Sequence, residues 1–308
     1  MSDLVCLGEP LLEFSAVARD GETVYLQGYG GDTSNCAIAA ARQGARVGYV
    51  TAVGDDAFGR EFLDLWQREE VSVDAITVDP QAPTGLYFIT YKDGLHEFSY
   101  RRAGSAASRM RPETLPLDAI RKARILHVSG ISQAISDSAC DAVFTAIATA
   151  RESGTQVSYD TNLRLKLWPV ARARAIIHAA MAEADIALPG LEDAQQLTGL
   201  DAPDAIVDFY LKLGPKVVAL TMGAAGTLVA TADLRETVPA HKVDPLDATA
   251  AGDTFDGAFL ARLLAGDGVV DAVRYANTAA ALSTQGYGAV APMPTKDAVQ
   301  KALAEAGE

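Results

Sequence analysis

The stretch LDATAAGDTFDGAFLARLL, residues 246–264, decides how the rest of the chain is interpreted. Small residues at 248 and 250–252 leave the backbone uncovered just before the run 254–264, whose pattern predicts a helix. Consecutive N–H groups at such a helix start would face outward and could bind an anion. Asp253 lies at the mouth of this predicted site, where a carboxylate can take the proton from an attacking hydroxyl. The stretch therefore indicates a kinase of small alcohols, although an Asp that only complements a helix dipole would leave the same pattern.

Composition bounds the class of protein. The chain has 308 residues, of which 49% are hydrophobic, so it can bury a large core. Its net charge of −14 would repel nucleic acid and anionic membranes, and we expect neither as a partner. Cys6, Cys36 and Cys140 show no close spacing, which predicts core cysteines, a reducing compartment and no thiol metal site. Because no apolar run reaches membrane-spanning length and the first residues lack a secretion-signal pattern, we expect a cytoplasmic protein.

Short apolar runs alternate with alanine-rich helical stretches along most of the chain. This rhythm predicts an α/β fold in which a mainly parallel sheet is covered by helices on both faces. The predicted strands occupy residues 4–7, 47–54, 125–130, 156–160, 184–189 and 216–221. Residues at the carboxyl ends of such strands face a site. Arg164 follows one of these strands and is a candidate anion clamp, because a guanidinium pairs a carboxylate or phosphate through two parallel hydrogen bonds; a solvated surface arginine is the alternative.

Residues 84–101 interrupt this rhythm with two strand-like runs, 84–91 and 96–101, around the hairpin signal Lys92-Asp93-Gly94. The strand-like segment 13–29 could pair with this hairpin and form a small sheet over the site. The side chains that would then face a ligand are Tyr87, Tyr100 and Arg102. Alternating aromatics in a hairpin also occur as plain cross-strand pairs, so that alternative stays open.

Glycines and small polar residues precede another helical stretch. Gly30 and Gly31 come just before Thr33-Ser34-Asn35, which we predict to cap an alanine-rich helix that ends near Gly44. A polar ligand could reach the backbone and the Asn35 amide there, although a tight turn and a helix cap explain the same residues. The loop 221–226 has the glycines for a turn that approaches a nucleotide, or equally for a hairpin corner. No G-x-x-x-x-G-K-[ST] phosphate loop and no dinucleotide fingerprint occurs.

Two of these motifs together resemble the signatures of the ribokinase-like (PfkB) family of sugar kinases. They are the run 30–44, which begins GGDTSNCA, and DATAAGDTF at 247–255. The likeness spans almost the whole chain. Within the family the sequence is most similar to the group that phosphorylates the sugar acid 2-keto-3-deoxygluconate, since YRRAGSAAS at 100–108 resembles that group's Tyr-x-Arg-x-Gly-Ser-Ala motif. DTNLR at 160–164, followed by Leu167-Trp168, resembles a second motif of the group, and its members share Ala-Ala-Gly-Asp in place of the commoner Gly-Ala-Gly-Asp.

The resemblance implies one ribokinase-like kinase domain over residues 1–308. This fold would have three layers, α/β/α, with a mainly parallel central sheet, plus a small β-sheet lid from about residues 12–32 and 83–104. The resemblance implies ATP and Mg²⁺ as cofactors and leaves a monovalent cation open. It also implies a small-molecule sugar acid and ATP as partners, and a homo-oligomer.

The resemblance also implies roles for individual residues. Asp253 would be the general base, and the amides of Ala250, Ala251, Gly252 and Asp253 would form an anion hole. The residues implied to contact the sugar acid are Gly31, Asn35, Tyr87, Tyr100, Arg102, Arg164 and Asp253. The residues implied to line the ATP site are Thr221, Gly223, Gly226 and Asn277.

Two positions depart from the family pattern. The family's Asn-x-x-Glu motif, which helps to organise magnesium, corresponds here to Gly190-Leu191-Glu192-Asp193, so the metal ligands stay open, with Asp193 or Glu192 as substitutes acting through water. Ala250 replaces a glycine and must adopt a conformation that a Cβ tolerates.

Two other functions remain as alternatives. A kinase of a neutral sugar such as fructose or ribose would have no carboxylate for Arg102 and Arg164 to bind. A non-catalytic member that binds a sugar or a nucleotide would have no need of Asp253.

Overall fold

The computed structural model describes residues 1–19, 21–92 and 95–307. Its central sheet has the strand order β14-β13-β12-β11-β10-β9-β1-β4-β5, and β6 pairs with β4 beside this path. The strands are β1 (Leu4–Leu7), β4 (Val47–Gly54), β5 (Val71–Ser72), β6 (Ile76–Asp79), β9 (Ile125–Ser129), β10 (Gln156–Asp160), β11 (Ile186–Leu188), β12 (Val217–Thr221), β13 (Thr227–Ala230) and β14 (Arg235–Val238). Pairing is parallel from β12 through β5, while β13 and β14 are antiparallel. The predicted mainly parallel sheet is confirmed.

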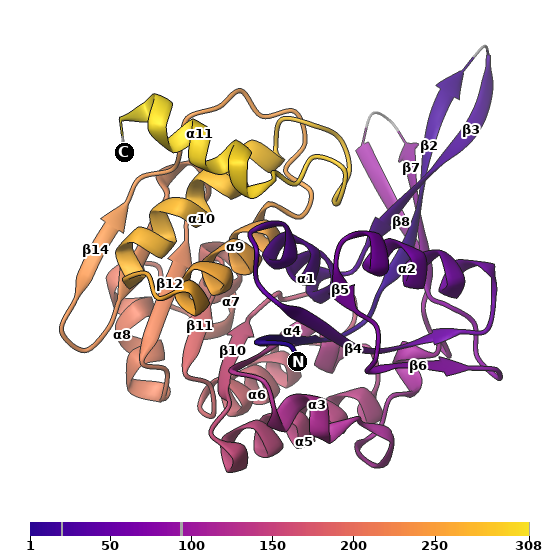
Figure 1. Ribbon diagram of the computed structural model, residues 1–308, viewed down its shortest axis with the longest axis horizontal. Coiled ribbons are helices and arrows are strands. Elements are labelled where there is room, and N and C mark those ends of the chain that lie inside the picture. Colours follow the sequence, from indigo (N-terminus) through magenta and orange to yellow (C-terminus); the bar gives the residue numbers. More distant parts are fainter. Residues whose placement is uncertain (20, 93–94, 308) are drawn as a thin grey trace.

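Helices cover both faces of this sheet (Figure 1). One face packs α1 (Asp32–Arg42), α2 (Ala57–Arg68), α9 (Ala251–Ala265), α10 (Val269–Ser283) and α11 (Lys296–Ala306). The other face packs α3 (Leu117–Arg121), α4 (Gly130–Ala134), α5 (Asp137–Ser153), α6 (Val170–Met181), α7 (Leu191–Thr198) and α8 (Pro203–Leu213). Alternate residues of a strand serve opposite faces, so Leu4 and Cys6 join the first core and Val5 and Leu7 the second. The three-layer α/β/α architecture is therefore confirmed.

The contact between α1 and α9 is unusually close because both helices present small residues. A Cβ added to Gly257 of α9 would lie 2.4 Å from the carbonyl oxygen of Cys36 and 2.7 Å from the Cβ of Ala39. Only glycine on one helix and small side chains on the other permit this approach. The contact joins two segments that are more than two hundred residues apart in sequence, and it carries Asn35 and Asp253 with them.

The start of α1 differs from the predicted cap. The N-cap is Gly31, with φ 107°, and the helix begins at Asp32. A left-handed glycine turns the chain into the helix, so Thr33, Ser34 and Asn35 lie within its first turns and are buried. The Thr33 hydroxyl is 3.1 Å from the Tyr49 hydroxyl, and the Trp66 indole donates to Ser34 at 2.9 Å. The capping prediction is therefore wrong, since these side chains bond to distant elements and not to the helix end.

A second, smaller sheet stands apart from the central one (Figure 1). Its order is β3 (Glu22–Gly30), β2 (Leu11–Arg19), β7 (Leu86–Lys92) and β8 (Leu95–Arg101). The predicted pairing of segment 13–29 with the hairpin is confirmed, with β2 and β7 parallel. Asp93 and Gly94, the predicted turn, lie outside the described residues.

The remaining regular elements are short. They are the 3-10 turns Ala107–Arg109, Pro112–Thr114 and Gly223–Ala225. Cys6, Cys36 and Cys140 are free and buried, as predicted. Within the described part of the chain, no helix is both long and apolar enough to cross a membrane.

Candidate active site

The first turn of α9 presents unpaired backbone N–H groups. The helix begins at Ala251, earlier than the predicted 254, because Ala250 is its N-cap with φ 58° and ψ 18°. This left-handed conformation is one that a residue with a Cβ adopts at a cost. The Ala251 N–H donates to the Ala248 carbonyl at 3.2 Å, whereas those of Gly252 and Asp253 have no acceptor among the described residues. These two amides are therefore available to an anion at a helix N-terminus.

The carboxylate of Asp253 lies beside the amide of Asn35. The Asn35 Nδ2 donates to the Asp253 Oδ2 at 2.8 Å, which joins the first turns of α1 and α9. Burial raises the pKa of Asp253 to about 7, and the nearby Asp32 carboxylate adds to the effect, while the Asn35 bond and Arg164 oppose it. A carboxyl group with a pKa near neutrality is matched to the work of a general base.

Further carboxylates surround Asp253 that the sequence did not single out as site residues. They are Asp32 in the first turn of α1, Asp160 at the end of β10, and Asp256 one turn beyond Asp253. The pKa of Asp160 is raised by burial first and then by the charges of Asp253 and Asp32. That of Asp256 is raised by burial and then by Asp160. This concentration of negative charge would be relieved by a bound cation or a proton.

A cavity of about 250 Å³ opens at this end of the central sheet. Its lining residues are Asp160, Asn162, Arg164, Leu188, Gly190, Asp193, Thr221, Ala248, Ala250, Ala251, Gly252, Asp253 and Asp256. Arg164 is exposed, and its Nη1 donates to the Leu163 carbonyl at 2.9 Å. No carboxylate of the described residues lies within ion-pair distance of it. The cavity is therefore lined by the guanidinium of Arg164, which has no ion-pair partner, by a cluster of carboxylates and by free backbone N–H groups.

The donor set of this cavity fits a hard divalent cation bound mainly through water. Asp193 and Asp160 both line the cavity, whereas Glu192 is exposed and does not line it. Asp193 Oδ2 also accepts from the Leu163 N–H at 2.8 Å, and burial raises its pKa. No group of His, Cys, Asp or Glu side chains in the described part is arranged to enclose a metal by itself. Mg²⁺ commonly keeps several waters and takes one or two carboxylates, so Asp193 and Asp160 are its candidate holders.

The residues predicted for the ATP site are not all in this cavity. Thr221 lines it, whereas Gly223 and Gly226 form the corner between the antiparallel strands β12 and β13. The loop is therefore a hairpin corner, and its approach to a nucleotide stays a prediction. The Asn277 amide donates to the carbonyls of Val238 and Pro239, and its oxygen accepts from Thr227 at 2.7 Å. Asn277 therefore fastens α10 to β13 and β14.

Tyr87 and Tyr100 lie on the small sheet as a cross-strand pair. They are opposite one another on β7 and β8, and their rings stack with centroids 5.6 Å apart. The Tyr87 hydroxyl donates to the buried carboxylate of Glu13, a residue that the sequence did not single out. A Cβ added to Gly30 would lie 2.8 Å from this hydroxyl, so Gly30 makes room for Tyr87.

Arg102, at the end of β8, is engaged in a buried ion pair. Its Nη2 donates to Glu9 Oε2, and the two side chains are 9% and 3% exposed. Glu9 is the second residue after β1, and its other oxygen accepts from the Ser105 hydroxyl at 3.2 Å. The two arginines that were predicted to contact the sugar acid therefore differ, because Arg102 is in an ion pair with Glu9 and Arg164 has no carboxylate partner among the described residues. Glu9 was missed, although its place at the carboxyl end of a strand was a signal.

Gly31 lies between the strand end that carries Glu9 and the helix that carries Asn35. A Cβ at this position would fall 2.4 Å from the Glu9 carbonyl oxygen. Together with its φ of 107°, this close approach restricts the position to glycine. Gly31 thus fixes the distance between the strand end that carries Glu9 and the helix that carries Asn35.

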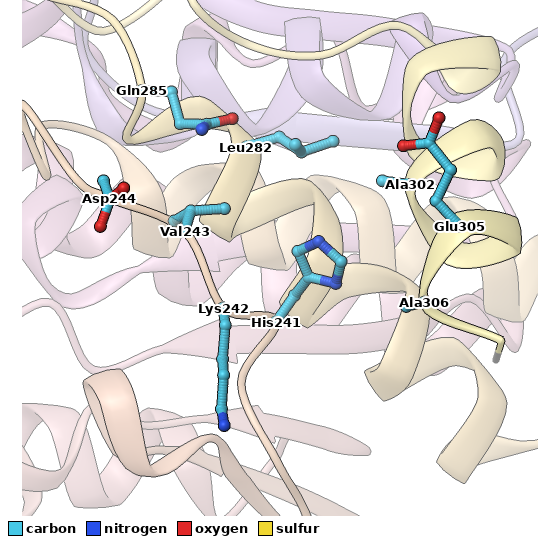
Figure 2. A pocket seen from close by; sticks show the side chains of 9 residues that line it. All are labelled: His241, Lys242, Val243, Asp244, Leu282, Gln285, Ala302, Glu305 and Ala306. Atoms are coloured by element: carbon cyan, nitrogen blue, oxygen red, sulfur yellow. The ribbon is translucent and has the colours of Figure 1, made fainter.

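A larger cavity of about 580 Å³ lies away from Asp253, and none of the predicted site residues lines it. It is formed by the loop 241–244, the end of α10 and helix α11. Figure 2 shows the His241 ring facing the side of α11 that carries Glu305, while Lys242 extends away.

Comparisons with known proteins agree with the architecture. The model of the pfkB family of carbohydrate kinases matches residues 1–296. A probable fructokinase-4 of Arabidopsis thaliana is 34% identical over 316 residues, covering 97% of this chain and 96% of its own. A 2-dehydro-3-deoxygluconokinase of Thermoproteus tenax is 36% identical over 275 residues, covering 86% of this chain and 83% of its own.

Among solved structures, a fructokinase of Vibrio cholerae in its fructose-, ADP- and calcium-bound form superposes with a TM-score of 0.87. It is 29% identical, and the match covers 98% of this chain and 99% of that one. The structural match therefore spans nearly the whole of both chains.

Proposed function

The chain belongs to the pfkB family of carbohydrate kinases, and we propose that it transfers the γ-phosphoryl group of ATP to the C6 hydroxyl of 2-keto-3-deoxygluconate. The observation that carries the choice of a sugar acid is Arg164. Its guanidinium lines the same cavity as Asp253 and has no carboxylate partner among the described residues. A substrate carboxylate would supply that partner, while its hydroxyl approaches the base.

In this proposal, residues of the chain take up the proton and stabilise part of the charge of the reaction. Asp253 accepts the proton of the C6 hydroxyl, and the hydroxyl oxygen forms a bond to the γ-phosphorus as the bond to the ADP oxygen breaks. Asn35 holds the carboxylate of Asp253 in place through its 2.8 Å hydrogen bond. The N–H groups of Gly252 and Asp253 stabilise the negative charge on the transferred group.

Mg²⁺, held by Asp193 and Asp160 with water, would neutralise phosphate charge when it is bound. The raised pKa values of both carboxyls, which burial causes, support this assignment, because a cation would favour their ionised forms.

We propose that residues 1–308 form one kinase domain in which the small sheet acts as a lid. β3 ends at Gly30 and α1 begins at Asp32, so a hinge between the small sheet and the rest of the fold would lie at Gly31. Binding of the sugar acid should then protect residues 83–92 and 95–104 from amide hydrogen exchange, because closure excludes water. Unchanged exchange at saturating substrate would argue against a lid.

A specific observation favours a second candidate, a kinase of a neutral sugar. Arg102 is already neutralised by Glu9, which leaves one free cation where a clamp of two was expected. Fructose, the sugar in the Vibrio cholerae complex, is the test case. The deciding experiment is a coupled ADP-release assay of the purified protein with Mg-ATP and equal concentrations of 2-keto-3-deoxygluconate, fructose and ribose. A higher kcat/KM for the sugar acid supports the first candidate, and a higher value for fructose supports the second.

A further inference from the structure

The segment that leads into α9 ends in a strained conformation. Ala250, its last residue, has φ 58° and ψ 18°, which a residue with a Cβ adopts at a cost. Such a conformation persists where the surrounding structure fixes the backbone. The N–H groups of Gly252 and Asp253, which have no acceptor among the described residues, follow within three residues of Ala250. Their direction therefore depends on what holds the segment before α9.

Hydrogen bonds join this segment to the α10–α11 loop, residues 284–295. The N–H groups of Leu246 and Asp247 both donate to the Thr284 carbonyl, at 2.7 and 3.1 Å. One carboxylate oxygen of Asp247 accepts from the Thr249 N–H at 2.9 Å and from its hydroxyl at 2.6 Å. The other oxygen accepts from the Gly288 N–H at 2.9 Å. The segment before α9 is therefore only as well placed as the α10–α11 loop.

Arg42, the last residue of α1, holds the same loop. Its Nη1 donates to the Val290 carbonyl at 3.0 Å and to the Met293 carbonyl at 2.5 Å. Its Nε and Nη2 donate to the two carboxylate oxygens of Glu69, each at 2.8 Å. This bond pair fixes the plane of the guanidinium, so that Nη1 stays directed at the loop. Val290 is 7% exposed and lies two residues after Gly288, whose N–H bonds to Asp247.

Helix α1 therefore contacts the start of α9 by two routes. Near the beginning of α1, Asn35 donates to the carboxylate of Asp253. At its end, Arg42 acts through the α10–α11 loop and Asp247 on the backbone before Ala250. The first route positions the proposed base, and the second positions the backbone that leads to the free N–H groups. A loosened loop would leave the base in place but would let these N–H groups lose their fixed direction, which is what makes them effective toward an anion.

We propose that Arg42 is a positioning residue for phosphate binding, which acts by fixing the α10–α11 loop and, through it, the N–H groups at the start of α9. Arg42 itself does not touch the nucleotide. This inference rests on the proposed function for the role of these N–H groups in binding the phosphates of ATP, but not on which sugar is phosphorylated.

Calorimetric titration of the full chain with Mg-ATP, in the absence of sugar, tests this proposal. Arg42→Met removes the bonds to the loop and should raise the Kd for Mg-ATP by at least about fivefold. Arg46→Met is the matched control, because Arg46 makes the same two-bond contact, at 2.8 Å each, with Asp3, and no bond from it to the loop is found among the described residues. This control should change the Kd by less than about twofold.

Amide hydrogen exchange follows the loop directly. In Arg42→Met without nucleotide, exchange of residues 246–250 and 286–290 should become at least about tenfold faster, because the N–H bonds between Asp247 and its partners open more often. Exchange of the same residues should stay unchanged in Arg46→Met.

Two further variants separate positioning from a general loss of stability. Glu69→Gln removes the charge of the partner but leaves an amide oxygen that accepts from the guanidinium, so Nη1 stays with the loop and the Kd should change by less than about twofold. Arg42→Lys keeps the charge but replaces the planar fork by one ammonium group. If Arg42→Met does not fold, Arg42→Lys must still raise the Kd by at least about threefold.

Equal Kd values for the Arg42 variants and Arg46→Met would overturn the proposal. An equal rise in Kd for Arg42→Met and Glu69→Gln, or unchanged exchange of residues 246–250, would also overturn it. If the unmodified protein binds Mg-ATP but phosphorylates fructose and not 2-keto-3-deoxygluconate, the sugar-acid function fails, while the nucleotide titrations still decide the role of Arg42.

Discussion

Charged and polar groups pair with one another next to the small sheet, whereas several of them have no partner at the end of the central sheet. Beneath the small sheet, Arg102 is paired with Glu9, and Tyr87 donates to Glu13. At the end of the central sheet, Arg164 has no carboxylate partner and the amides of Gly252 and Asp253 have no acceptor within the described chain. Buried groups that satisfy one another contribute to structure, whereas unsatisfied groups around a cavity need a ligand to complete them. The two arginines, which look equivalent in sequence, therefore have different expected roles.

The stability of arginine variants should give the largest contrast between the two regions. Arg102→Ala leaves Glu9 buried without its cation and should reduce the free energy of unfolding by about 3–5 kcal/mol. Arg164→Ala removes an exposed side chain and should change it by less than about 0.5 kcal/mol. Urea denaturation of both variants measures the difference. Equal destabilisation would contradict the distinction between a paired and an unpaired arginine.

Loss of the proposed base should affect turnover and leave the fold intact. Asp253→Asn retains the shape of the side chain but cannot take up the hydroxyl proton, so kcat should fall by about 100-fold or more. Binding of ATP, measured by calorimetry, should change little. Asp297→Asn is the matched control, because Asp297 is an exposed acidic residue in the first turn of another helix. Near-normal turnover of Asp253→Asn would remove this residue from the mechanism.

The free cation should discriminate between substrates. Removal of one partner of a desolvated charge pair costs about 2–5 kcal/mol, so Arg164→Ala should lower kcat/KM for 2-keto-3-deoxygluconate by roughly 30-fold or more. Activity on fructose should hardly change, because that sugar offers no carboxylate. Parallel assays of both sugars with Arg164→Ala and Arg164→Lys provide the measurement. If both sugars lose activity equally, Arg164 does not bind a carboxylate.

The pH profile should report the electrostatics of the carboxylate cluster. Burial and Asp32 raise the pKa of Asp253 to about 7, and a general base must be ionised to accept a proton. Activity is therefore present above this pH and is lost as the pH falls through about 7. We expect kcat/KM to decrease about tenfold per pH unit below that value. A profile that stays flat to pH 5 would show that the pKa of the base is not raised.

The smallest effect concerns the backbone at the start of α9. Ala250 has a left-handed conformation that costs a residue with a Cβ about 1 kcal/mol, so Ala250→Gly should raise stability by up to that amount. Gly266, with φ 98° at the other end of the same helix, is the matched control, and Gly266→Ala should lose about 1 kcal/mol. Thermal melts compare the two. Destabilisation by Ala250→Gly would mean that the alanine methyl contributes packing at this position.

The sequence predicted those features that are local or periodic. Apolar runs that alternate with helical stretches predicted the parallel sheet. The small residues before Asp253 predicted a helix start with exposed backbone N–H groups. Asn35 and Asp253 lie in two motifs that were assigned to the same ligand site. The two residues do contact one another, although they are more than two hundred residues apart in sequence. By contrast, the predicted cap of α1 was wrong, because Gly31, with its positive φ, is the N-cap and the helix begins at Asp32.

The charge partners could not be predicted in the same way. Glu9 and Arg102 are 93 residues apart, and neither lies in a pattern that distinguishes an ion pair from a free clamp. Asp32 and Asp256 each occupy a helix position where acidic residues are ordinarily solvated. Asp256 is nevertheless buried and Asp32 partly buried, at the place where α1 and α9 pack closely, and this packing is a property of the assembled fold.

Phosphorus NMR of a reaction mixture containing the enzyme, Mg-ATP and 2-keto-3-deoxygluconate tests the central claim most directly. We expect ATP to be converted to ADP and a new phosphomonoester resonance to appear, split into a triplet by the two protons of the C6 methylene group. Absence of a new ester while fructose is phosphorylated under the same conditions, or a doublet typical of an ester at a secondary carbon, would contradict it.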